Sequence, residues 1–159
     1  MSTTCELVQV ADAVAAELNA ESFSLPFTAV RHYETAMELE ETGEIAVDVV
    51  PVSPGMEEES DTTLRFDSAV DVAVRYKFTS ADTDPATGRI NTLAVDDLLN
   101  LVQELGRFLS LRRLTEFDAV FVSIETMFGW VPDHLQQWSQ FTSIFRVTYR
   151  TSLPAEEAA

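Results

Sequence analysis

The sequence is poor in cysteine and glycine. Its single cysteine, Cys5, cannot form a disulfide within one chain, so the fold does not depend on an oxidising compartment. Only five glycines occur in 159 residues, and no two of them share a phosphate-binding loop motif. This excludes a Gly-rich nucleotide site, and we expect Cys5 to be incidental rather than nucleophilic.

Positive charge is scarce and unevenly placed. Ten basic residues stand against 27 acidic ones, which gives a net charge of −17 at pH 7. Residues 1–64 hold fourteen acids and one base, Arg31, whereas residues 65–159 hold thirteen acids and nine bases. An acidic surface repels phosphate backbones, so ordinary DNA or RNA binding is disfavoured.

Long apolar runs are also missing. No stretch approaches the roughly 18 apolar residues of a membrane-spanning helix. Glu6 and Asp12 interrupt the apolar residues near the start, where a signal peptide would carry a basic leader instead. We therefore expect a soluble protein made in a reducing cytosol, with no membrane partner. The length suits a single domain over residues 1–159.

The predicted sheet is centred on residues 64–78. Apolar residues there share one parity and charged residues the other, which is period-two alternation over fifteen residues. Such a long strand must be paired along most of its length or bent by a bulge, which we expect at Ser68 and Ala69. Further strands are predicted over residues 28–39, 44–52, 118–128 and 141–151. In the fourth of these, Val120, Val122 and Ile124 are expected to share a face.

Two amphipathic helices are predicted. The first covers residues 4–20, and Thr3 and Glu6 have the spacing of a capping box at its start. The second is capped by Asn91 or Thr92. Its apolar stripe consists of Leu98, Leu101, Val102, Leu105, Phe108 and Leu109.

The remaining segments are predicted to be irregular. Residues 53–63 contain proline, glycine and acids without periodicity, which indicates a mobile acidic loop, and Pro51 and Pro54 should end the pairing of the preceding strand. Residues 129–140 are expected to be irregular and residues 153–159 a frayed tail. The order α-β-β-β-α-β-β predicts an α+β fold, a mainly antiparallel sheet with two helices packed on one face.

Candidate chemical groups are few. His32 and Glu34 would share a face of a strand and offer two ligands to a metal, and Asp133 and His134 are adjacent in sequence. Spacing indicates no third ligand for either pair. We therefore predict no metal, no cofactor and no catalytic residue.

Residues 129–138 are the strongest candidate for an interface. Both tryptophans lie there, outside any periodic pattern, so the segment either folds back on its own core or is buried by a partner. The predicted interface residues are Trp130, Val131, Pro132, His134, Leu135, Trp138, Tyr33 and Met37. A predicted acidic surface, which either solubilises the chain or repels nucleic acid, consists of Glu57, Glu58, Glu59 and Asp61.

Several segments resemble small tail-terminator, or tail-completion, proteins of tailed bacteriophages. These are ADAVAAELNA, SFSLPFTAVRHY, EIAVDVVPVS, ELGRFLSLRRL and FTSIFRVTYRTSL, which together extend over nearly the whole chain. The resemblance implies a non-catalytic α+β subunit of the virion, assembled in the host cytoplasm as a ring, typically a hexamer. Such a ring ends polymerisation of the tail tube, contacts neck or connector proteins and in contractile tails the sheath, and lets DNA pass through its lumen.

Other functions remain open. The chain is also compatible with an acidic regulatory or DNA-mimicking binding protein, or with a different head-tail connector or stopper subunit. A small enzyme using His32, Glu34, Asp133 and His134 is a further alternative. Mass in solution distinguishes a ring from a monomer, and metal analysis tests the enzyme.

Overall fold

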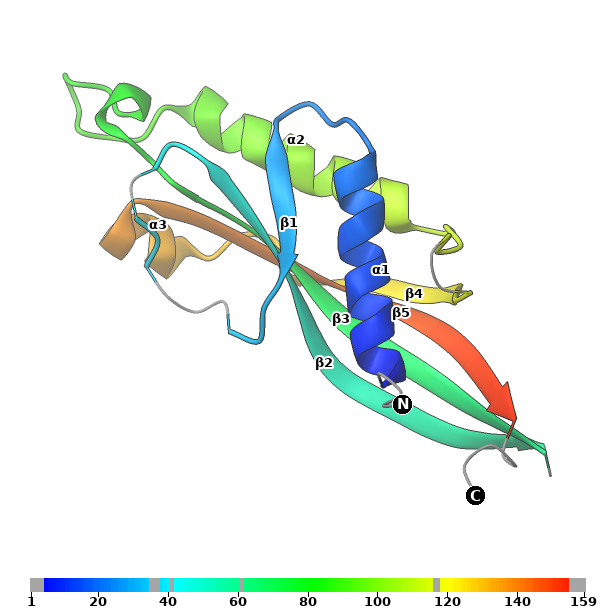
Figure 1. The fold of residues 1–159 in the computed structure, drawn as a ribbon. Helices are drawn as coiled ribbons and strands as arrows, with labels where there is room; N and C mark the ends of the chain where they lie inside the picture. The colour runs from blue at the N-terminus through cyan, green and yellow to red at the C-terminus, as the bar shows by residue number, and fades with distance from the viewer. Residues whose placement is uncertain (1–4, 35–37, 41, 61, 116–117, 155–159) are drawn as a thin grey trace.

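The computed structural model of the chain describes residues 5–34, 38–40, 42–60, 62–115 and 118–154. A mixed sheet has the strand order β1-β2-β3-β5-β4, with β1 and β2 parallel and all other neighbours antiparallel (Figure 1). The predicted α+β class is confirmed. The elements are α1 (Glu6–Ala20), β1 (Phe27–Arg31), β2 (Ile45–Ser60), β3 (Thr63–Lys77), α2 (Thr92–Leu109), β4 (Val120–Phe128), α3 (Pro132–Trp138) and β5 (Gln140–Pro154), with a short 3-10 turn at Ser80–Asp82.

Strand β3 forms the centre of the sheet, as the alternation predicts. It pairs with β5 without interruption from Thr63 to Lys77, and its other side pairs with β2. The predicted bulge at Ser68 and Ala69 is wrong, because the extra residue is Val52 on β2. A bulge in β3 would disturb two ladders at once, whereas at Val52 only one side of β2 is paired.

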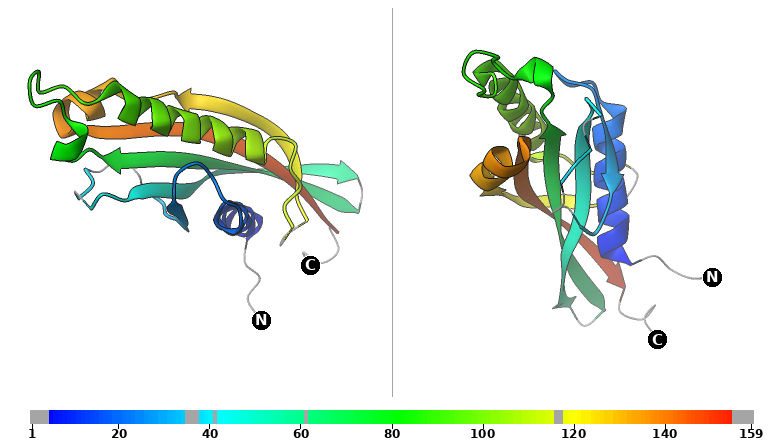
Figure 2. Two further views of the ribbon diagram at one scale, coloured as in Figure 1. Left: turned by 90° about the horizontal axis from the view of Figure 1, so that it is seen from above. Right: turned by 90° about the vertical axis from the view of Figure 1, so that its left-hand side faces the viewer.

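Helices α1 and α2 cover one face of the sheet, which confirms the predicted layer (Figure 2). Helix α2 is capped by the Asn91 side chain, which accepts a hydrogen bond from the Leu93 N–H at 3.1 Å. The Tyr149 hydroxyl of β5 donates to the Leu109 carbonyl at 3.1 Å, and burial raises the pKa of this tyrosine. Fully buried residues of this core include Val10, Val14, Leu18, Val72, Val74, Leu101, Leu105, Phe141 and Val147.

Helix α1 starts two residues later than predicted. It begins at Glu6 with Cys5 as N-cap, and Cys5 makes no capping hydrogen bond. Glu6 is therefore the first helical residue and not the third, so it does not serve as the acidic member of a capping box. Its carboxylate instead accepts a hydrogen bond from the Thr151 hydroxyl at 2.9 Å, which joins α1 to β5. The other half of the predicted box, Thr3, lies outside the described residues.

The predicted loop over residues 53–63 is wrong, because β2 continues to Ser60 and pairs with β3. Strand β1 accompanies β2 only as far as Val49, so beyond that point no described strand pairs with this edge of β2, and Pro51 and Pro54 are tolerated there. Beyond the helices, β2, β3 and β5 form a projecting three-stranded extension (Figure 1). We call it the arm, and it comprises residues 55–60, 63–67 and 150–154.

Strand β4 lies at the far edge of the sheet, and its predicted facing is wrong. Phe121 and Ile124 pack against the core, while Val120 and Val122 are exposed. The reason is a bulge at Val122, where Phe121 pairs with Tyr149 but Ser123 pairs with Thr148, so the alternation changes phase. The exposed apolar residues of β4 are Val120, Val122, Met127 and Phe128.

The predicted irregular segment 129–140 contains helix α3. Pro132 occupies its first turn with Asp133 beside it, which are the usual signals of a helix start, but seven residues are too few for a period to emerge. Helix α3 lies on the outer face of the sheet, by which we mean the face opposite α1 and α2 (Figure 2). Of the predicted tail, residues 153 and 154 belong to β5.

The strand predicted over residues 28–39 is shorter than expected, since β1 ends at Arg31. Residues 79–91 form the predicted turn, with Gly88 in the left-handed conformation at a φ of 72°. In the part of the chain that the structure describes, no helix has both the length and the apolar character needed to cross a membrane.

Candidate functional site

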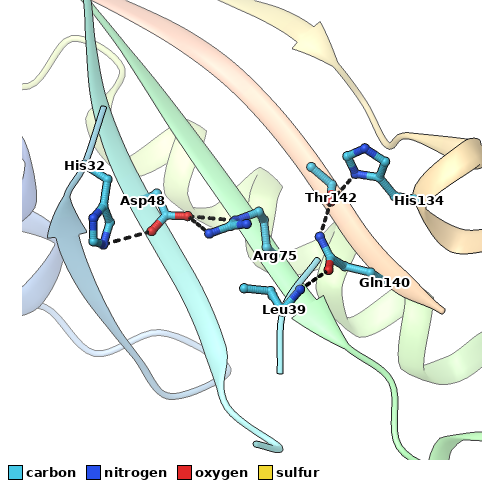
Figure 3. Close-up of polar contacts among 7 residues, drawn as sticks. All are labelled: His32, Leu39, Asp48, Arg75, His134, Gln140 and Thr142. Atoms are coloured by element: carbon cyan, nitrogen blue, oxygen red, sulfur yellow. Dashed lines mark hydrogen bonds and ion pairs between the residues drawn. The ribbon is translucent and has the colours of Figure 1, made fainter. Parts of the chain in front are cut away.

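A buried ion pair lies on the outer face, where β2 meets β3. Arg75 donates from Nε to Asp48 Oδ2 at 2.7 Å, and its Nη2 lies 2.6 Å from the same oxygen (Figure 3). Both side chains are about 95% buried, with exposed fractions of 5% and 6%. His32 Nε2 lies 3.5 Å from the other oxygen, Asp48 Oδ1, and is half exposed. Asp48, on β2, is therefore linked both to Arg75 of β3 and to His32, the residue that follows β1.

A second polar group continues across the outer face on β5. The Leu39 N–H donates to Gln140 Oε1 at 2.8 Å, and Gln140 Nε2 donates to Thr142 Oγ1 at 3.2 Å. His134 Nδ1 lies 2.9 Å from the same Thr142 hydroxyl (Figure 3). Because Gln140 is fully buried, these bonds attach residues 38–40 and α3 firmly to the sheet.

The two histidines therefore lie apart. His32 contacts β2, whereas His134 contacts β5, and β3 runs between those strands. Glu34 and Asp133 are exposed. Among the described residues, no three His, Cys, Asp or Glu side chains are grouped so that they could hold a metal ion. The polar groups on this face are arranged as structural hydrogen bonds.

The predicted interface segment divides into an outward and an inward part. Trp130 keeps 44% of its surface exposed, and Pro132 is also exposed. By contrast, Leu135 packs against the core, and the Trp138 ring lies 4.5 Å from the His134 ring. Val131 is half-buried, and its N–H donates to the Thr142 carbonyl of β5 at 2.9 Å. The segment thus folds back on the core through Leu135, whereas burial of Trp130 by a partner stays a prediction.

Tyr33 and Met37 were also predicted as interface residues. Tyr33 is exposed, and its hydroxyl accepts a hydrogen bond from Arg31 Nη1 at 2.9 Å. Met37 lies outside the described residues. For the predicted acidic surface, the backbone of Glu57, Glu58 and Glu59 belongs to β2, and Asp61 is outside the described residues.

Most basic residues are neutralised within the fold. Eight of the ten form a salt bridge, and in the described part of the chain only Arg89 and Arg107 form none. On the outer face, the hydrogen bond from Arg150 holds the pKa of Asp67 below its usual value. The paired residues are Arg31, Arg65, Arg75, Lys77, Arg112, Arg113, Arg146 and Arg150.

Two grooves open beside α2. The first, of about 850 Å³, lies between β1 and the start of α2, and its lining includes Glu40, Glu44, Asp82 and Asp97. The second, of about 450 Å³, lies between α2 and β4, and we call it the α2–β4 groove. Its lining includes Leu99, Val102, Gln103, Gly106, Arg107, Ile124, Thr126 and Phe145.

Sequence reasoning missed both the α2–β4 groove and the apolar surface of the arm. The groove joins residues far apart in the chain, so no local pattern indicates it. On the arm, Met56 is 67% exposed and pairs in register with Phe66, while Leu153 pairs with Leu64. These surfaces are suited to binding another protein. Comparison with models of known protein families and with curated proteins found no match for this chain.

Proposed function

We propose that the protein is a structural subunit of a bacteriophage tail that assembles as a ring, typically a hexamer, and ends the tail tube at its head-proximal end. The observation that carries this proposal is the presence of two separate uncovered apolar surfaces. One is the β4 edge with Trp130, and the other is the arm with Met56. Exposed apolar surfaces of this kind mark sites of protein association.

Two unlike surfaces suit a ring better than a two-fold dimer. A head-to-tail contact joins one patch to a different patch on the neighbour, and it closes when the rotation between subunits completes a circle. A two-fold dimer would need only one self-complementary patch. The arm and the β4 edge belong to different strands of the sheet, so each subunit offers one of them to each neighbour.

The charge distribution agrees with a channel for DNA. A net charge of −17, with eight of ten bases already paired, leaves few cations to bind phosphates. DNA would therefore pass through such a lumen without being held. The partners of the ring are then the tail-tube protein, neck or connector proteins and, in a contractile tail, the sheath, and its location is the virion.

The proposal is tested by the mass of the purified protein and by its effect on tube growth. Light scattering after size exclusion should give about six times the 17.7 kDa of the chain for a hexamer, and negative-stain images should show rings. Adding the protein to polymerising tail-tube subunits should cap one end and shorten the tubes. A monomer that leaves tube length unchanged would contradict the proposal and favour an acidic regulatory protein.

Replacing Trp130 by Ala should weaken assembly while leaving the fold intact. Its half-exposed ring contributes little to the core but is suited to an interface, where aromatic anchors dominate the binding energy. We expect a dissociation constant at least tenfold higher, which corresponds to about 1.4 kcal/mol, measured by sedimentation at several concentrations. Leu93→Ala, at an exposed apolar residue at the start of α2, is the control. Loss of cooperative unfolding in Trp130→Ala would instead assign this ring to the core.

A further inference from the structure

We propose that the larger of the two grooves binds a basic segment of another protein, in which lysine or arginine alternates with large apolar side chains. This groove, of about 850 Å³, lies between β1 and the start of α2, and we call it the acidic groove. The inference goes beyond the proposed function, because it assigns a third surface, apart from the β4 edge and the arm.

The apolar part of the acidic groove is an uncovered end of the hydrophobic core. Phe27 and Ile45 begin the parallel strands β1 and β2 and lie opposite each other in register. Both are only partly buried and pack against the core, as do Leu25 and Tyr76, while Leu98 of α2 is buried. An apolar side chain of a ligand placed here would extend the core and leave water.

The lining of the acidic groove also contains four carboxylates and no base. Glu40 and Glu44 come from the segment before β2, Asp82 from the 3-10 turn, and Asp97 from α2. These segments are far apart in the chain, so the fold brings the acids to one place. Glu40, Glu44 and Asp97 are exposed, and within the described residues none of the three forms a salt bridge.

The carboxylate of Asp82 is held in place by the fold itself. Its Oδ2 accepts hydrogen bonds from the Thr79 N–H at 2.9 Å, the Thr79 hydroxyl at 3.1 Å and the Tyr76 hydroxyl at 3.2 Å. A carboxylate that is already oriented loses little conformational freedom when a base approaches it. The acidic groove is therefore partly organised for a cation before any ligand binds.

The chemistry of the lining selects the class of ligand. Carboxylates repel phosphates and other anions. Among the residues that the structure describes, no three His, Cys, Asp or Glu side chains could hold a metal ion together. A groove of about 850 Å³ with acids from three separate segments suits several bases along one chain better than a single small amine. A segment that alternates bases with apolar side chains is complementary to both parts of the lining.

A second copy of this chain is a poor occupant of the acidic groove. Each copy has a net charge of −17, and eight of its ten bases are already in salt bridges within its own fold. In the described part of the chain, only Arg89 and Arg107 form none. A segment with several available bases must therefore come from a different protein.

The acidic groove stays accessible in the proposed ring. It lies where β2 begins and β3 ends, whereas the arm is formed by the opposite ends of these strands (Figure 1). Strand β1 beside the groove and strand β4 are the two opposite edges of the sheet. Contacts through the arm and the β4 edge therefore leave this groove free for a further partner.

Titration of the full chain with three short blocked peptides tests the proposal. One peptide alternates lysine with leucine, the second glutamate with leucine, and the third lysine with serine. The lysine–leucine peptide should bind at least tenfold more tightly than either of the others in a calorimeter, and its affinity should fall as salt is added. Equal affinity of any two of these peptides, or no binding of the lysine–leucine peptide, overturns the proposal.

Matched substitutions locate the binding site. Glu44→Gln combined with Asp97→Asn removes two carboxylates from the lining and should raise the dissociation constant of the lysine–leucine peptide by about tenfold. The control combines Glu34→Gln with Asp96→Asn, which removes the same charge from exposed residues outside the lining. This control should bind the peptide like the unmodified chain. An equal loss in both pairs would show attraction to the net charge alone and overturn the proposal.

Two further measurements exclude other occupants. If n-hexylamine displaces the lysine–leucine peptide at the concentration at which the peptide itself binds, the groove takes a free amine and the proposal is overturned. If Glu44→Gln with Asp97→Asn weakens self-association of the chain, a second copy occupies the groove, which also overturns it. Ring formation and tube capping are measured without the peptide. Failure of peptide binding therefore leaves the proposed function standing, and a monomeric chain that binds the peptide contradicts only the proposed function.

Discussion

Replacing Asp48 by Ala should lower the free energy of unfolding by about 3–5 kcal/mol, because it removes one partner of a buried ion pair and with it the carboxylate that balances the Arg75 guanidinium. The side chain of Arg75 is 6% exposed, and two nitrogens of its guanidinium lie within 2.7 Å of a single Asp48 carboxylate oxygen, which accepts from them. Water cannot replace that carboxylate readily at such a depth. Urea denaturation monitored by tryptophan fluorescence and far-UV circular dichroism measures the loss.

The matched control removes both charges together. A double variant with Asp48→Leu and Arg75→Met should recover most of the lost stability, since the desolvation penalty disappears along with the attraction. If the double variant is as unstable as Asp48→Ala, the pair stabilises the fold through the geometry of its hydrogen bonds and not through the balance of its two charges. A single variant that loses less than about 1 kcal/mol would contradict the expected cost of breaking this buried ion pair.

Local patterns predicted the elements whose environment is uniform along their length. Strand β3 is flanked on both sides from Thr63 to Arg75, so its alternation of apolar and charged residues remains in phase throughout. Helix α2 was predicted for a similar reason, since Leu98, Leu101 and Leu105 all face one sheet and Asn91 caps the first turn. The α+β class followed from these elements and their order.

The errors arise where the environment changes within one element. Strand β2 loses its neighbour β1 after Val49, and only this change makes Pro51 compatible with a strand. The bulge at Val122 reverses the facing of β4 in the middle of a regular pattern. Neither event leaves a local signal, because each depends on which strands lie alongside.

In the candidate site, too, the sequence predicted single exposed residues but not contacts between distant segments. Trp130 was predicted as an interface residue from its composition and context, and it is in fact one of the exposed aromatic side chains. The partner of Asp48 and the α2–β4 groove both need contacts between distant segments, so a single sequence gives no signal of them. Surface residues that stand alone are therefore easier to predict than surfaces that the fold assembles.

The other substitution with a large expected effect on the free energy of unfolding is Glu17→Ala. The buried Glu17 carboxylate on α1 accepts hydrogen bonds from the Thr115 N–H at 2.8 Å, the Thr115 hydroxyl at 2.6 Å and Arg112 Nε at 2.9 Å. It thereby fastens α1 to the segment between α2 and β4. Glu17→Ala should cost about 2–4 kcal/mol at pH 7, because several donors lose their acceptor together. Asp12→Ala, at an exposed carboxylate on the same helix, should change the unfolding midpoint little.

The pH dependence identifies Glu17 as the cause. Burial raises the pKa of this carboxyl, but the hydrogen bonds from Thr115 and Arg112 outweigh burial and hold the pKa below its usual value. A group with a lowered pKa in the folded state stabilises the protein above its unfolded pKa of about 4.3 and loses that contribution as the pH falls through the folded pKa. The stability difference between the unmodified chain and Glu17→Ala should therefore be constant from pH 7 to about 5 and shrink below about pH 4. A difference that persists unchanged at pH 3 would show that the lost packing, and not the charged carboxylate, accounts for the effect.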